Sequence, residues 1–176
     1  ALPTLDLGED IELCEGESVV LAAPLADSYL WQNSATSQTI EASTSGTFGV
    51  TITSGICTSS GEVEITVNPF PTIDLGEDLT LCEGESTILT ASTADSYEWS
   101  NGATTQTIAV SQADVYNVTI TSNNCSSSDE IEVLYNPLPV ISLGEDLTLC
   151  EGETTTLDAT PDNAVDLGAI TYLWHD

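Results

Sequence analysis

Leu75-Gly-Glu-Asp-Leu-Thr-Leu-Cys-Glu-Gly-Glu85 is the stretch of sequence that decides how this chain is organised. Its first four residues recur from Leu7 and from Leu143, each time followed by Leu-Cys-Glu-Gly-Glu, so three copies are separated by two intervals of 68 residues. Residues 1–68 align with residues 69–136 without a gap, and 38 of the 68 positions are identical. The chain is therefore an array of one small module, and such arrays act mainly through reach, stiffness and valency.

Within one repeat, apolar residues alternate with polar ones in short runs that turn residues separate. The alternation predicts β-strands, and no segment shows the spacing of a helix. In the second repeat we expect seven short strands or extended segments, at 72–75, 79–82, 86–91, 97–99, 106–110, 115–121 and 130–135. Seven short alternating strands are typical of a β-sandwich, so the predicted fold is all-β.

The module boundaries follow from the 68-residue period. We expect a first repeat at 1–68, a second at 69–136 and an incomplete third at 137–176. Asn-Pro-x-Pro segments join the modules, and two prolines in four residues predict a short, stiff connector. The large apolar residue in each joint is expected to pack into the seam between modules, the alternative being an exposed linker residue. The joint residues are Pro69, Phe70, Pro71, Pro137, Leu138 and Pro139.

The charge is extreme, with no Lys or Arg against 29 Asp and Glu, a formal net charge of -29. Phosphate binding needs cationic side chains, so nucleic acid is a poor partner, and anionic membrane surfaces are excluded for the same reason. Disorder is contradicted by a hydrophobic fraction of 40% that falls in patterned runs. No apolar run is long enough to span a membrane, and no signal peptide is present, so we expect this to be a piece of a longer protein whose targeting segments were removed or lie elsewhere.

The cysteines predict an oxidising compartment. Cys14 and Cys57 are 43 residues apart, as are Cys82 and Cys125, and the simplest interpretation is one disulfide within each full repeat. Zinc is the alternative, but no Cys-x-x-Cys pair exists and His175 is the only histidine. Disulfides place the protein outside the cell, secreted or on the cell surface. Cys150 has no partner within its repeat and is expected to be unpaired or intermolecular.

Two resemblances add to this interpretation. The order Cys–Trp–Cys resembles that of immunoglobulin-like domains, although the second cysteine follows the tyrosine strand by more residues than in antibodies. The amino-acid sequence of the repeat more closely resembles the immunoglobulin-like or PKD-like tandem repeats of large secreted surface proteins of gliding and related Bacteroidota. The matching stretches are 75–78, 81–85, 97–108, 116–121 and 136–139. The resemblance implies tandem immunoglobulin-like β-sandwich repeats that serve as spacers and adhesive stalks on the cell surface.

An acidic cluster near each joint is the best candidate for a site. Ca²⁺ prefers several carboxylate and carbonyl oxygens from flexible loops, so a calcium ion at each joint would stiffen the array. The alternative is a solvated acidic face that keeps the surface soluble. The candidate ligands are Asp6, Glu9, Asp10, Glu15 and Glu17; Asp74, Glu77, Asp78, Glu83 and Glu85; and Glu145, Asp146, Glu151 and Glu153, with Ser142 in place of the third aspartate.

The aromatic residues have two interpretations. Trp31, Trp99 and Trp174 each follow a tyrosine by two residues, so each pair shares one face of a strand. Packing in the core is preferred over a sugar-stacking face. Residues 113–116 resemble a tyrosine corner around Tyr116, and Phe48 excludes the equivalent hydrogen bond from the first repeat.

Catalysis is not expected. The sole histidine, His175, rules out a Ser–His–Asp arrangement, and carboxylates copied in every repeat argue against a glycosidase site. The leading hypothesis is a structural repeat protein that forms a rigid extracellular stalk or fibre. Its partners would be neighbouring repeats or identical subunits. The alternatives are an adhesin whose repeats bind a glycan or a surface, and a filament subunit whose third repeat is completed by a strand of another chain. Relative to the second repeat, the third carries a seven-residue insertion, and we expect it to be a fragment of a longer array.

Overall fold

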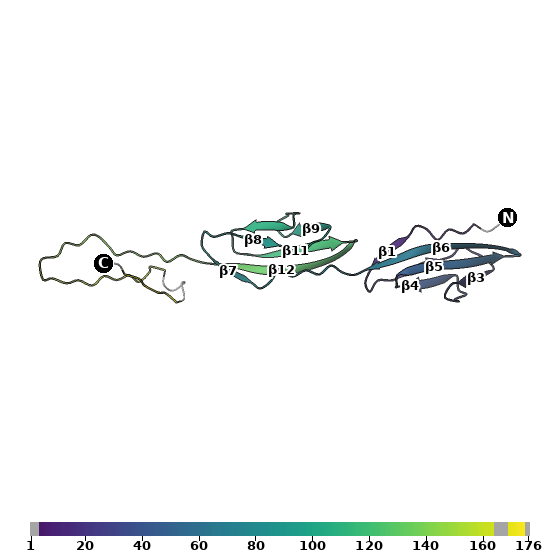
Figure 1. Ribbon diagram of the computed structural model, residues 1–176, viewed down its shortest axis with the longest axis horizontal. Coiled ribbons are helices and arrows are strands. Elements are labelled where there is room, and N and C mark those ends of the chain that lie inside the picture. Colours follow the sequence, from purple (N-terminus) through teal and green to yellow (C-terminus); the bar gives the residue numbers. More distant parts are fainter. Residues whose placement is uncertain (1–3, 164–168, 175–176) are drawn as a thin grey trace. The chain divides into compact units, whose positions relative to one another are not determined.

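The computed structural model describes residues 4–163 and 169–174, and every regular element in these ranges is a β-strand (Figure 1). His175 lies outside the described residues. The first repeat forms six strands: β1 (Ile11–Cys14), β2 (Val19–Ala22), β3 (Ser28–Trp31), β4 (Thr39–Ala42), β5 (Gly46–Ser54) and β6 (Cys57–Asn68). The second repeats them as β7 (Leu79–Cys82), β8 (Thr87–Thr90), β9 (Ser96–Trp99), β10 (Thr107–Val110), β11 (Asp114–Ser122) and β12 (Cys125–Asn136).

Each repeat builds one sheet of four strands and one of two. The first repeat has the orders β1-β6-β5-β3 and β2-β4, and the second has β7-β12-β11-β9 and β10-β8. The pairs β3–β5 and β5–β6 are antiparallel, whereas β1 runs parallel to β6 (Figure 1). Three antiparallel strands facing a smaller second sheet are the arrangement of an immunoglobulin-like sandwich. The predicted all-β, immunoglobulin-like fold is confirmed.

The core of the first sandwich takes side chains from both sheets. Leu21 and Ile40 come from the two-stranded sheet, and Ile52 and Ile65 come from the four-stranded one. Buried and exposed residues alternate along β4 and through the middle of β6, because successive side chains in a strand point to opposite faces. Trp31 is 2% exposed within this cluster, and its indole N–H donates to the Ser37 carbonyl at 2.9 Å. The indole is buried with its polar group satisfied, as a stable core requires.

The chain forms two compact units that do not coincide with the repeats. One takes the N-terminal part of the chain to Asp74, together with Ala91–Gln106 and Val118–Asp129. The other takes Leu75–Thr90, Thr107–Asn117 and the chain from Glu130 onward. The turn before β12 therefore belongs to the same compact unit as the first sandwich.

The sequence-based strand pattern needs three corrections. Residues 72–75 form no strand, so a repeat has six strands and not seven. The last strand of the second repeat begins at Cys125 and not at Glu130, because polar residues also alternate outward along its first half. The described residues of the third repeat form no strand.

The apolar joint residues are not packed into a seam. Phe70 is 48% exposed and Leu138 is 51% exposed. Both lie in segments without regular structure that prolines hold extended, which leaves their side chains in contact with water. The expectation of packing at the joints was therefore wrong, and the alternative of an exposed linker residue fits.

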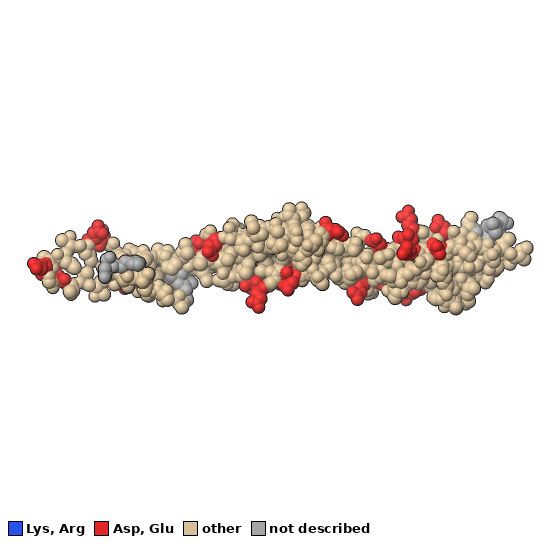
Figure 2. Space-filling view, viewed as in Figure 1, with Lys and Arg blue, Asp and Glu red and all other residues tan. Residues whose placement is uncertain are grey.

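Acidic side chains are distributed over the visible face of the molecule, with no basic residue among them (Figure 2). No polar or charged side chain is buried among the described residues. In the part of the chain that the structure describes, no helix is long and apolar enough to cross a membrane.

Candidate functional site

A disulfide joins Cys14 of β1 to Cys125 at the start of β12. The Sγ atoms are 2.02 Å apart, the Cα atoms are 5.6 Å apart, and the two residues are separated by 111 positions in the sequence. The bond thus links the first cysteine of one repeat to the second cysteine of the next. We name Cys14, Cys82 and Cys150 the strand cysteines, and Cys57 and Cys125, each preceded by a two-residue hairpin turn, the hairpin cysteines.

The predicted pairing within each repeat was wrong. In the parallel register Cys14 lies opposite Asn68, the last residue of β6, whereas Cys57 is the first residue of that strand. Eleven residues of strand at about 3.3 Å each separate these two ends by roughly 36 Å. A disulfide requires Cα atoms within about 7 Å, so Cys14 cannot reach Cys57 in this fold. Cys57, Cys82 and Cys150 are free thiols in the structure, and Cys82 cannot reach Cys125 for the same reason.

The turn before β12 is fitted against the end of β6 by polar contacts around the disulfide. The Asn68 side-chain amide donates to the carbonyl of Asn123 at 3.4 Å. The Asn124 amide donates to the carboxylate of Glu12 at 3.5 Å. Asn123 and Asn124 adopt φ angles of 49° and 63°, in the left-handed region that asparagine tolerates better than most residues. The asparagine pair therefore supplies both the tight turn and the polar groups that face the other repeat.

The Glu-Gly-Glu segments shape the turn after each strand cysteine. The Cys14 amide donates to Glu17 Oε2 at 2.8 Å, and the amide of Glu15 donates to the Asn68 carbonyl at 2.9 Å. The glycines of this motif have φ angles of 87°, 88° and 87° in the three repeats, a region that only glycine enters without strain. The second glutamate of the motif is therefore a turn-closing group that fixes the backbone of the cysteine.

The acidic residues of Leu-Gly-Glu-Asp also have structural roles. Asp10 Oδ1 accepts the amide of Glu64, and Asp78 Oδ1 accepts the amide of Glu132, each at 2.9 Å. Both carboxylates thus satisfy backbone donors of the last strand of their own repeat. Asp6 Oδ1 accepts the Gly8 amide at 2.9 Å.

Similar bonds occur farther along the chain. Glu85 accepts the Cys82 amide at 2.8 Å, and Glu153 accepts the Cys150 amide at 2.9 Å. Ser142, which replaces the aspartate, accepts the amide of Gly144 at 3.3 Å. Asp74 also takes part in an interaction. The other members of the acidic set are exposed to solvent: Glu9, Glu15, Glu77, Glu83, Glu145, Asp146 and Glu151.

The structure does not gather these carboxylates into a preformed ligand set. Among the described residues, no group of three or more His, Cys, Asp or Glu side chains is arranged to hold a metal ion. Several of the candidate ligands already accept backbone amides, which uses one carboxylate oxygen of each. Calcium binding stays a prediction, and calorimetric titration with millimolar Ca²⁺ tests it.

The tyrosine–tryptophan pairs of the two full repeats belong to the core. Trp31 and Trp99 are each 2% exposed. The hydroxyl of Tyr29 accepts the Ala26 amide, and that of Tyr97 accepts the Ala94 amide, both at 2.9 Å. The preferred packing interpretation is confirmed for these two pairs. In the third repeat Trp174 is 54% exposed.

Tyr116 forms the expected corner. It is 8% exposed, and its hydroxyl donates to the carbonyl of Gln112 at 3.1 Å. Burial raises the pKa of the Tyr116 hydroxyl above 10.0, and the nearby Asp114 and Tyr135 raise it further. Phe48 occupies the equivalent position in the first repeat and has no hydroxyl to donate.

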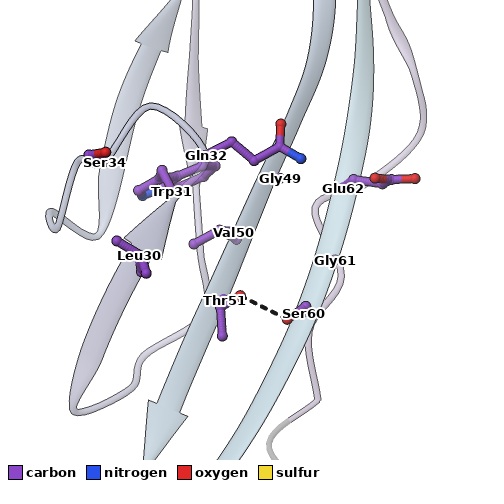
Figure 3. Close-up of a pocket in the computed structure, with 10 residues that line it drawn as sticks. All are labelled: Leu30, Trp31, Gln32, Ser34, Gly49, Val50, Thr51, Ser60, Gly61 and Glu62. Atoms are coloured by element: carbon purple, nitrogen blue, oxygen red, sulfur yellow. Dashed lines mark hydrogen bonds between the residues drawn. The ribbon is translucent and has the colours of Figure 1, made fainter.

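An open hollow of about 630 Å³ lies on the first sandwich (Figure 3). Its lining includes the hydroxyl pair Thr51–Ser60, whose oxygens are 2.8 Å apart, and the side chain of Gln32, which lies across Gly49 (Figure 3). A Cβ atom at Gly49 would lie 2.8 Å from Gln32 Nε2, so the absence of a side chain there makes room for the amide. The second repeat has Asn117 at the position of Gly49.

Comparison with known proteins identifies no relative by sequence, since no family model and no curated protein matches the chain. Among solved structures, tandem immunoglobulin structures are similar. A three-domain structure of titin has 10% identity and a TM-score of 0.49, over 78% of this chain and 67% of that one. Extracellular domains 3–5 of Drosophila OTK have 11% identity and a TM-score of 0.48, over 76% of this chain and 62% of that one.

The insect immune protein hemolin has 11% identity and a TM-score of 0.41, over 74% of this chain and 46% of that one. The chain thus spans about half to two thirds of the length of these proteins. The assignment of the fold rests on the strand order and registers of the chain itself.

Proposed function

We propose that this chain is a non-enzymatic, force-bearing segment of an extracellular stalk or fibre, in which successive immunoglobulin-like repeats are covalently linked. The Cys14–Cys125 disulfide carries this proposal, because it joins neighbouring repeats and not the strands of one. A bond of this kind adds little to the interior of either sandwich. It limits how far the two repeats can be drawn apart.

The disulfide changes the path along which a pulling force passes through the chain. When the chain is pulled from both ends, tension passes from Cys14 through the sulfur atoms to Cys125 and bypasses the residues between them. That loop contains most of both sandwiches, so they are shielded from the load while the bond is intact. Disulfides persist in oxidising environments, which supports a place outside the cell. The sequence of the repeats resembles that of surface proteins of Bacteroidota, which supports a location on a bacterial cell surface.

Single-molecule stretching of the whole chain, attached at its two ends, tests the proposal. The 111 positions closed by the disulfide correspond to roughly 370 Å of extended chain at about 3.3 Å per residue. With the bond intact, this length should be missing from the final extension, and a reductant should release it. Equal final extensions before and after reduction would refute a force-bearing role for the bond. The variant Cys57→Ser is the matched control, since it removes a cysteine and leaves the loop closed.

A glycan-binding adhesin is the second candidate, favoured by the hollow on the first sandwich (Figure 3). Leu30 is 56% exposed there and offers an apolar surface beside the Thr51–Ser60 hydroxyls and the Gln32 amide. Sugars present the same mixture of apolar faces and hydroxyl groups. A glycan array probed with the intact chain and with Gln32→Ala tests this role, and binding unchanged by the substitution would place any glycan site elsewhere.

A further inference from the structure

Two free cysteines, Cys57 and Cys82, occupy the positions that are bonded elsewhere in the same chain. Cys82 lies 68 residues after Cys14, and Cys57 lies 68 residues before Cys125. Cys82 is exposed and Cys57 is partly buried. The bonded pair joins a strand cysteine to the hairpin cysteine of the following repeat, so the same rule leaves two strand cysteines, Cys82 and Cys150, and one hairpin cysteine, Cys57, without a bonded partner in this structure.

The surroundings of Cys82 reproduce those of Cys14 bond for bond. The Cys82 amide donates to Glu85 Oε2 at 2.8 Å, as that of Cys14 does to Glu17. The Glu83 amide donates to the Asn136 carbonyl at 2.8 Å, as that of Glu15 does to Asn68. Cys82 also lies opposite Asn136 in the parallel register of β7 and β12. The backbone at Cys82 is therefore already in the conformation that holds a disulfide at Cys14.

Cys57 is likewise placed as Cys125 is. It opens β6 directly after the turn of Gly55 and Ile56, and Gly55 has a φ of 61° where Asn123 has 49°. The Gly55 amide donates to Asp27 Oδ2 at 2.7 Å, and the Asn123 amide donates to Asp95 Oδ2 at 3.0 Å. The two hairpin turns thus share a left-handed first residue and its carboxylate support, whereas the second residue has a positive φ at Asn124 and not at Ile56.

The two turns carry different side chains, and the strand residues that these side chains would face differ as well. At the bonded junction Asn124 meets the carboxylate of Glu12. The equivalent turn residue in the first repeat is Ile56, which is 101% exposed, and the equivalent of Glu12 in the second repeat is Thr80. An isoleucine against a carboxylate would desolvate a charge, whereas an isoleucine against a threonine methyl group would not. The turn before Cys57 would therefore fit better beside Cys82, where it meets Thr80, than beside Cys14, where it would meet Glu12.

We propose that Cys57 and Cys82 form disulfides of the same kind as Cys14–Cys125, in which Cys82 bonds the hairpin cysteine, and Cys57 the strand cysteine, of another repeat; we call this series of bonds the disulfide ladder. A second copy of this chain can supply that repeat, so that Cys82 of one copy bonds Cys57 of another. A small disulfide such as oxidised glutathione supplies the oxidation. One protein thiolate attacks it to give a mixed disulfide and one free small thiol. The second protein thiolate then displaces the other small thiol, so that the two electrons and two protons leave on two glutathione molecules. This inference rests on the proposed covalent array and extends it from one junction to its neighbours.

Oxidation of the full chain with mixed oxidised and reduced glutathione tests the ladder. The variant Cys150→Ser is used, because Cys150 is a third free thiol and is exposed. The net charge of -29 opposes association, so the reaction is run in about 0.5 M NaCl to screen it. Because the chain has no Lys or Arg, a glutamate-specific protease is used for mapping. It places Cys57 in the peptide 42–62 and Cys82 in the peptide 78–83.

The expected result is a series of oligomers that reductant returns to monomer, with peptide 42–62 joined to peptide 78–83 as the main new cross-link. Random coupling of two equally reactive thiols would give mixed and like–like products in about equal total amounts. Such a mixture, or a chain that stays monomeric with both thiols free, would overturn the ladder. Cys57→Ser and Cys82→Ser should each stop growth beyond a dimer.

The same digest distinguishes this inference from the proposed function. Cys14 falls in peptide 13–15 and Cys125 in peptide 99–130, so their disulfide is read independently. If that bond is present and the cross-link between Cys57 and Cys82 is not, the ladder fails and the force-bearing junction stands. If Cys14 is instead found bonded to Cys57, both fail.

Discussion

Cys14 and Cys125 are bonded across 111 positions of sequence, although each has another cysteine of its own repeat only 43 positions away. Sequence proximity is thus a poor guide to pairing in a sandwich of long strands. A twelve-residue strand carries its two ends farther apart than a disulfide can span. The junction between repeats, where the end of β6 meets the turn before β12, brings the correct pair together.

Removing this bond should destabilise the chain more than removing any free thiol. Closing a loop of 111 positions stabilises the folded state by about 5 kcal/mol in the chain-entropy model, because it restricts the unfolded chain. We expect Cys125→Ser to lower the free energy of unfolding by about 3–5 kcal/mol in urea titrations. Cys57→Ser is the control and should change it by less than about 1 kcal/mol. A small effect of Cys125→Ser would show that the bond does not form in solution.

Asp78 should matter through its hydrogen bond and not through its charge. Its Oδ1 accepts the Glu132 amide of β12 at 2.9 Å, and loss of the acceptor leaves that donor unpaired. We expect Asp78→Ala to cost about 1–2 kcal/mol of unfolding free energy. Asp78→Asn keeps an acceptor oxygen and should cost less, and the neighbouring exposed Glu77→Gln should cost almost nothing. Equal effects of Asp78→Asn and Asp78→Ala would instead point to the charge.

The repeat period, the all-β fold and the buried tryptophans could be predicted from the sequence, because strand alternation and a 68-residue repeat are local or directly visible patterns. The partner of Cys14 could not, since it depends on which end of β6 lies beside β1. The acidic motif has two interpretations in the sequence, a cation site or a solvated acidic face, because the sequence shows carboxylates without their partners. The structure shows that Asp10 and Glu17 accept backbone amides. The one sequence feature that indicates this structural role is the constant spacing of these two acidic residues from the turn glycines.

Alkaline pH should destabilise the second repeat through Tyr116. Burial holds the pKa of its hydroxyl above the unfolded value of about 10, so the neutral form is favoured in the folded state. The resulting stability is fully present below pH 10 and is lost as the pH rises through the higher folded value. Tyr116→Phe should flatten this alkaline loss and cost about 1 kcal/mol at neutral pH, where the bond to Gln112 is lost. Phe48→Tyr provides the reciprocal variant in the first repeat. An alkaline loss of stability that persists unchanged in Tyr116→Phe would assign it to other groups.

Salt should stabilise this protein throughout the neutral pH range. With 29 acidic residues and no Lys or Arg, the folded state is opposed by self-repulsion that attractive ion pairs with basic side chains cannot offset. Raising NaCl from about 0.01 M to 0.5 M shortens the screening length from roughly 30 Å to below 10 Å, so we expect Tm to rise by several degrees. The double variant Glu9→Gln/Glu77→Gln neutralises two exposed carboxylates and should weaken the dependence on salt, whereas Tm should rise at low salt. Differential scanning calorimetry measures both, and a Tm that is flat or falls with NaCl would show that hydration or compensating cations, and not repulsion among the carboxylates, govern stability.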